Sequence, residues 1–90
     1  MDIPDLSSLN LASIARIARA DWSKAKSGIF YAAEPYLKAM GTMADLNGYF
    51  GAERGDDIVL RFLANASSWR GPVAKAVKAE LNKRLKGRGL

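Results

Sequence analysis

Apolar residues recur at three- and four-residue spacing in four stretches of the chain, which are separated by Gly, Pro, Asp and Ser. This spacing is typical of amphipathic helices that turn one apolar stripe toward a core. It predicts four helices, over about residues 8–24, 33–47, 57–68 and 72–85. We therefore expect an all-α fold, a compact single domain over residues 1–90, whose tail at residues 86–90 frays because two glycines and flanking cations give it little reason to order.

Capping signals suggest where these helices begin. Ser7 or Ser8 is a candidate N-cap of the first helix, because a short side chain with an oxygen accepts hydrogen bonds from free backbone N–H groups. Asp56 or Asp57 is the candidate N-cap of the third helix for the same reason. Residues 49–55 contain two glycines and no periodicity, so we expect an irregular connection there.

The third helix is the most apolar of the four. Between Ile58 and Ala64, only Arg61 interrupts the apolar surface. A helix that is apolar nearly all round is buried nearly all round. We therefore expect this helix to lie at the centre of the fold, with Phe62, Leu63 and Ala66 surrounded by the other helices.

Composition narrows the chemistry that the chain can carry. Its 90 residues are 49% hydrophobic and 26% charged, which is typical of one ordinary globular domain. The chain contains no Cys and no His, which excludes disulfides, a thiolate nucleophile, an imidazole base and the usual ligands of structural zinc. We predict no catalytic residues, no metal and no cofactor, and hence no enzymatic activity.

The N-terminus gives no targeting signal. Residues 1–5 are acidic and contain a proline, unlike the basic and then apolar regions of a secretory signal. No apolar run approaches the roughly 20 residues that a membrane-spanning helix needs. We therefore expect a cytoplasmic protein with no membrane partner.

Charge is distributed unevenly along the chain, whose net charge is +5. Residues 1–69 hold seven basic and eight acidic side chains, whereas residues 70–90 hold seven basic side chains and one acidic side chain, Glu80. On the fourth helix, Lys75, Lys78, Asn82 and Lys86 share one stripe. Such a stripe attracts polyanions, whether nucleic acid or an acidic protein surface. The same stripe also fits an ordinary solvated face, with cations near the negative end of the helix dipole.

These charges define the candidate sites. The predicted partner-binding residues are Arg70, Lys75, Lys78, Lys83, Arg84, Lys86 and the neighbouring Trp69. Arg16 and Arg19 form a secondary basic patch, which would merge with the first if the first and fourth helices lay side by side. Aromatic pairs at residues 30–31 and 49–50 either join such a surface or anchor loops to the core.

Several segments carry a resemblance, and together they extend from about Asn10 to Leu85. The segments are Ile14-Ala15-Arg16, Asp21-Trp22, residues 30–40, Phe62-Leu63-Ala64-Asn65-Ala66, Trp69-Arg70-Gly71 and Lys78-Ala79-Glu80-Leu81. In their order and spacing they resemble a family of short proteins encoded by phages, prophages and plasmids of Gram-negative bacteria. The chain departs from that pattern in its longer basic tail and in residues 24–28. The resemblance implies a genomic setting and transfers no functional residue.

Small proteins of mobile elements commonly act by binding: they block host defence complexes such as CRISPR effectors, redirect host enzymes or regulate the element's own genes. The resemblance therefore implies an interaction protein that binds a host protein or protein–nucleic-acid complex, with inhibition of a defence system such as CRISPR as the leading hypothesis. The alternative is a nucleic-acid-binding accessory protein that makes mainly phosphate contacts, because lysines dominate the fourth helix. A homodimer joined through an exposed apolar side is a third interpretation.

Overall fold

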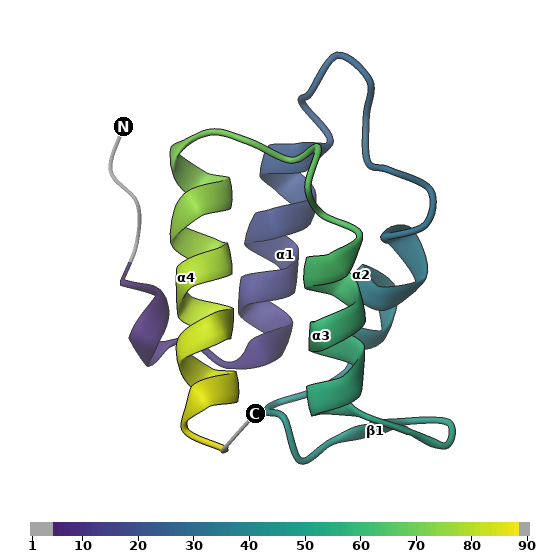
Figure 1. Cartoon of the computed structure of the whole chain (residues 1–90), viewed down its shortest axis with the longest axis vertical. Helices are drawn as coiled ribbons and strands as arrows, with labels where there is room; N and C mark the ends of the chain where they lie inside the picture. The colour runs from purple at the N-terminus through teal and green to yellow at the C-terminus, as the bar shows by residue number, and fades with distance from the viewer. Residues whose placement is uncertain (1–4, 89–90) are drawn as a thin grey trace.

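The structure, a computed structural model, describes residues 5–88. Its elements in chain order (Figure 1) are the 3₁₀ turn Leu6–Ser8, α1 at Leu11–Trp22, α2 at Glu34–Met40, β1 at Tyr49–Phe50, β2 at Glu53–Arg54, α3 at Gly55–Ala64 and α4 at Pro72–Lys86. The prediction that the tail frays from residue 86 is wrong for residues 86–88, because Lys86 ends α4 and Arg88 donates a hydrogen bond to the side chain of Asn47. Residues 89 and 90 of the predicted tail lie outside the described part. None of the described helices combines the length and apolar character needed to cross a membrane.

The four predicted helices are confirmed, but the fold is not purely all-α. β1 and β2 form a small antiparallel sheet in which Tyr49 lies opposite Arg54 and Phe50 lies opposite Glu53. Gly51 turns the chain between them at a φ of 66°, a left-handed conformation that favours glycine. The prediction of an irregular connection over residues 49–55 is therefore wrong, because strands of two residues are too short to show an alternating pattern in the sequence.

The first two helices are shorter than predicted. α1 begins after Asn10, whose side-chain oxygen accepts a hydrogen bond from the backbone N–H of Ser13 at 2.8 Å. The predicted caps Ser7 and Ser8 instead belong to the preceding 3₁₀ turn, so that prediction is wrong. α2 ends before Gly41 rather than at residue 47, because the chain turns there and continues in further turns.

The third helix also begins and ends earlier than predicted. Its N-cap is Arg54, so Asp56 and Asp57 lie within the first turn, and the prediction that either caps the helix is wrong. Their carboxylates still suit the positive end of the helix dipole. The helix starts at Gly55, whose missing side chain matters: an added Cβ would lie 2.9 Å from the carbonyl oxygen of Leu46. The close contact with the backbone of Leu46 therefore requires a glycine at the start of α3.

No helix among residues 5–88 is surrounded by the others. α1 and α3 each pack against both α2 and α4, so the four helices enclose a shared core (Figure 1). α3 buries Ile58, Val59 and Phe62. Leu63, however, is only partly buried, Leu60 is 43% exposed and Ala64 is also exposed. The prediction of a central third helix is therefore wrong, because its apolar run is wider than the face that its neighbours enclose.

Three aromatic rings lie together inside the core. Trp22 of α1 and Trp69 stack, with ring centroids 5.5 Å apart and planes 11° apart. Phe62 of α3 packs edge-on against both, at 6.2 and 6.3 Å. The indole N–H of Trp69 donates to a carboxylate oxygen of Asp21 at 2.9 Å. This aromatic cluster joins α1, α3 and the connection that leads into α4.

Replacing Phe62 by Ala should lower the free energy of unfolding by about 3–5 kcal/mol, because it empties an aromatic core site. Leu60→Ala on the same helix should cost less than about 1 kcal/mol, because that side chain is partly in solvent. Urea denaturation followed by circular dichroism measures both. Equal costs would show that α3 does not turn Phe62 inward.

Candidate partner-binding surface

The sequence of α4 separates an inner and an outer face. Val77, Leu81 and Leu85 are buried, as the periodicity predicts. Val73 is only partly buried, and Ala74 takes the inner position instead. The helix begins with Pro72 after a glycine, a combination that suits a first helical turn. The opposite face points into solvent and carries most of the charge.

Four of the predicted partner-binding side chains are exposed: Arg70, Lys75, Lys83 and Lys86. Within residues 5–88, none of the four forms an ion pair. The hydrogen bonds that Ser7 donates to Asp5 lower the pKa of that carboxyl, and the nearby charge of Lys83 lowers it further. We call Lys75, Lys83 and Lys86 the outer lysines of α4.

Lys78 does not belong to this exposed set. Its Nζ donates a hydrogen bond to the carbonyl oxygen of Trp69 at 2.7 Å and lies 6.0 Å from the centroid of the Trp69 ring. Burial lowers the pKa of Lys78, and the nearby positive charge of Arg70 lowers it further. The prediction that Lys78 shares an exposed stripe with Lys75, Asn82 and Lys86 is therefore wrong, because Lys78 stabilises the fold through its contact with Trp69.

Arg84 is also engaged within the molecule. Its Nε donates to a carboxylate oxygen of Glu80 at 2.7 Å. Its Nη2 donates to the carbonyl oxygens of Leu6 at 2.9 Å and Leu9 at 2.7 Å. Arg84 thus fastens the N-terminal segment to α4, and its guanidinium is not a free cation.

Trp69 is only 2% exposed, so its ring lies in the core rather than on a binding surface. The neighbouring Arg70 is exposed. Sequence alone placed both on one surface, because nothing local to Trp69 reveals that it stacks on Trp22, 47 positions earlier in the chain.

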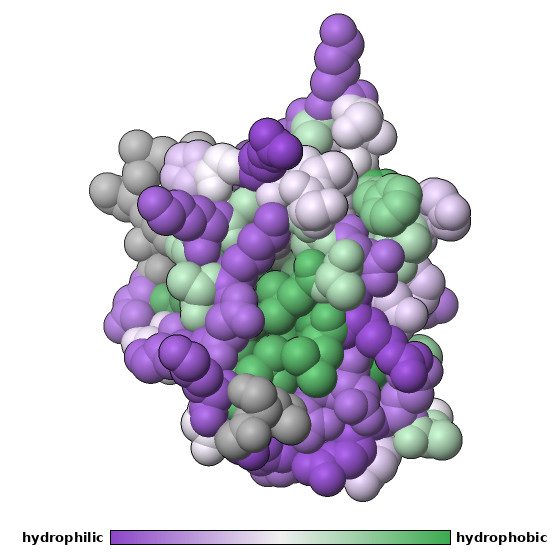
Figure 2. Space-filling model, viewed as in Figure 1, coloured by the Kyte–Doolittle hydropathy of each residue, from purple (hydrophilic) through white to green (hydrophobic). Residues whose placement is uncertain are grey.

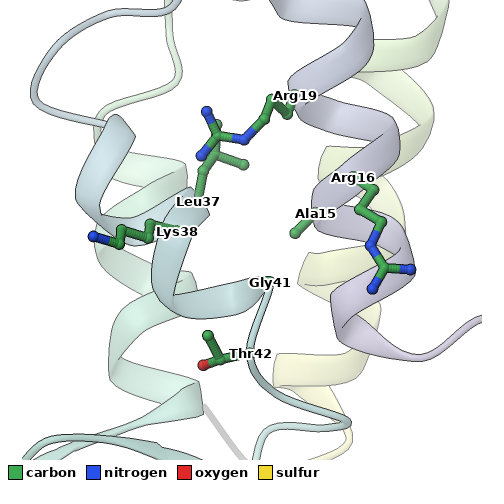
Figure 3. A pocket seen from close by; sticks show the side chains of 7 residues that line it. All are labelled: Ala15, Arg16, Arg19, Leu37, Lys38, Gly41 and Thr42. Carbon is green, nitrogen blue, oxygen red and sulfur yellow. The ribbon is translucent and has the colours of Figure 1, made fainter.

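The secondary basic patch does not merge with the α4 surface. α1 does pack against α4, but Arg16 and Arg19 border a groove between α1 and α2 (Figure 3). The groove measures about 240 Å³. Arg19 is paired with Glu34 of α2 at 2.6 Å, and the side chain of Lys38 points away from the groove. Positive charge therefore does not converge in it.

Two aromatic pairs outside the helices are exposed rather than anchored in the core. Tyr31 is 82% exposed and Phe30 41%, while Tyr49 and Phe50 are 62% and 44% exposed. Sequence periodicity carries no signal for these residues, because they lie outside the helices.

On the face formed by α3 and α4, Figure 2 also shows an apolar area bordered by polar side chains.

Neither metal chemistry nor known relatives assign a role to these surfaces. Among residues 5–88, no group of three or more His, Cys, Asp or Glu side chains is arranged to hold a metal ion. Comparisons with protein-family models, curated proteins and solved structures find no match.

Arg84→Ala should lower the free energy of unfolding by about 1–3 kcal/mol, because it leaves carbonyl oxygens without their donor. The adjacent Lys83→Ala should change it by no more than about 0.5 kcal/mol, because Lys83 is exposed. Urea denaturation of the two variants gives the comparison. A cost for Arg84→Ala as small as that for Lys83→Ala would contradict the fastening role.

Proposed function

We propose that this protein acts by binding, and that the outer lysines of α4 dock on an acidic surface of a host macromolecular complex. The observation that supports this is the exposure of Lys75, Lys83 and Lys86 on one helix, with no ion pair among the described residues. Charges aligned in this way provide electrostatic complementarity, which speeds encounter and selects the partner.

The spacing and rigidity of the outer lysines favour an extended contact. Lys75 and Lys86 are eleven positions apart on a continuous helix, which corresponds to about 16 Å along its axis. The hydrogen bonds of Lys78 and Arg84 hold this helix to the rest of the fold. A partner therefore meets cations on a fixed scaffold rather than on a loose chain.

The mobile-element setting implied by the resemblance suggests what that partner does. A small protein that occupies an acidic surface of a defence complex blocks it sterically, without any chemistry of its own. We therefore favour inhibition of a host defence system such as CRISPR as the biological role.

Nucleic acid is the second candidate partner, and the chemistry of α4 favours contact with phosphates over reading of bases. Lysine supplies a point charge rather than the paired donors that arginine offers to a guanine edge. The amide of Asn82 donates to the carbonyl oxygen of Lys78 at 2.9 Å, so this donor is engaged within the helix. Such a surface would bind duplexes with little sequence preference.

A plaque assay tests the defence hypothesis. In a strain with CRISPR immunity against the infecting phage, expression of the protein should raise plaque numbers. The double variant Lys75→Glu, Lys86→Glu should weaken docking by about tenfold or more, about 1.4 kcal/mol, and lower plaque numbers accordingly. The control Arg16→Glu, Lys38→Glu makes the same change in net charge away from α4 and should keep the activity.

Two results would contradict this proposal. Plaque numbers that do not change on expression, across strains with different defence systems, would overturn defence inhibition. Equal loss in both double variants would show that net charge matters and that the α4 surface does not.

Salt dependence separates the two candidate partners. Titration of labelled duplex DNA with the protein, followed by fluorescence anisotropy, should show little binding if the partner is a protein surface. Binding whose logarithm falls with the logarithm of salt concentration, with a slope of about −0.9 per neutralised phosphate, would favour the nucleic-acid alternative. Loss of that slope in Lys75→Glu, Lys86→Glu would then locate the contact on α4.

A further inference from the structure

Two connections meet at one end of the helical fold. The α1–α2 loop and the α3–α4 connection both lie at the end where α1 finishes and α4 starts (Figure 1). The stack of Trp22 on Trp69 joins them, and the hydrogen bond from Trp69 to Asp21 fixes their relation. We call this region the α1–α4 end.

The α1–α2 loop presents an aromatic pair to solvent. The rings of Phe30 and Tyr31 are in edge contact, with centroids 5.0 Å apart, and most of the Tyr31 side chain is exposed. Backbone hydrogen bonds from Gly28 to Ala25 and from Ala33 to Phe30, both 2.9 Å, order the loop. The backbone that carries the two rings is therefore ordered before any ligand arrives, which reduces the entropy lost on binding.

Exposed cations lie on both connections at the α1–α4 end. Lys24, Lys26 and Arg70 are exposed, and none of them forms an ion pair within the described residues. The acidic side chains nearest in sequence are already engaged: Asp21 accepts from Trp69, and Glu34 pairs with Arg19. The cations are therefore left to attract an anionic ligand.

An open depression lies on the other side of this end, next to the α3–α4 connection. It measures about 460 Å³ and lies at the start of α4. Its lining combines apolar surface with three cations, in the residues Trp69, Arg70, Gly71, Ala74, Lys75 and Lys78. Apolar surface bordered by cations suits a ligand that carries both flat rings and phosphates.

We propose that the α1–α4 end binds single-stranded nucleic acid, with bases stacked on Tyr31 and Phe30 and phosphates contacted by Lys24, Lys26 and Arg70. Unpaired bases offer their faces to aromatic side chains, whereas a duplex buries those faces. A single strand offers unpaired bases to the rings and phosphates to the cations, and this combination matches the side chains at this end of the fold. Apart from Lys75, which borders the depression, this site does not include the outer lysines of α4, and it extends the proposed function.

Fluorescence anisotropy with labelled twelve-nucleotide oligo(dT) and oligo(rU) tests the stacking. Tyr31→Ala should weaken binding by about fivefold or more, while Tyr31→Phe should retain most of the affinity. Tyr49→Ala removes another exposed ring, on the hairpin, and should leave the affinity unchanged. Circular dichroism of each variant checks that the fold is intact.

Salt titrations test the phosphate contacts. Lys24→Ala with Lys26→Ala should reduce the magnitude of the log–log salt slope by about 1.4, because each contact with a single strand contributes about 0.7. The matched variant Lys83→Ala with Lys86→Ala should keep the slope. If this matched variant also reduced the salt slope, the phosphate contacts would lie on α4.

Three outcomes would overturn the inference: no binding of either oligonucleotide at low salt, equal loss in Tyr31→Ala and Tyr49→Ala, or tighter binding of a duplex of the same length. A protein partner would show itself if Tyr31→Ala lost activity in the plaque assay although neither oligonucleotide bound. Because the plaque assay of the α4 variants does not involve Tyr31, failure at one site can be told from failure at the other.

Discussion

The stack of Trp22 on Trp69 is the contact on which the arrangement of the fold most depends. It brings the end of α1 against the connection into α4, and Phe62 adds α3 to the same cluster. The hydrogen bond to Asp21 satisfies the buried indole N–H, which would otherwise lose a partner on leaving water. With Trp69 held inward, its carbonyl oxygen accepts from Lys78, and the next residue, Arg70, reaches solvent.

Arg84 performs the corresponding task toward the other end of α4. By donating to two carbonyl oxygens of the N-terminal segment it fixes that segment against the helix. Two of the cations in the basic last quarter of the chain thus stabilise the fold. The net charge of that quarter is consequently larger than the charge that its surface exposes. The exposed lysines, which do not take part in these two contacts, form the face that we propose for binding.

Sequence periodicity predicted the four helices because each has a stripe of apolar residues, and Phe62 and Leu81 are buried as that stripe requires. It did not predict the β pair or the early end of α2, because these depend on short-range turns and on one close contact at Gly55. It also could not separate Lys75 from Lys78, since both lie on the polar side of the helix. Only the carbonyl of Trp69, brought close by the tertiary fold, distinguishes them.

The aromatic residues fall into two groups, those buried in the core and those exposed to solvent. Trp22 and Trp69 are enclosed because three elements converge on them, whereas Tyr31 lies on a loop that no helix overlies. Single exposed apolar residues are ordinary on any protein surface. Two adjacent rings in contact with each other, on an ordered loop with unpaired lysines, form a more specific feature. Since the core is complete without them, their exposure costs the fold little, and the same exposure leaves both rings available to a ligand.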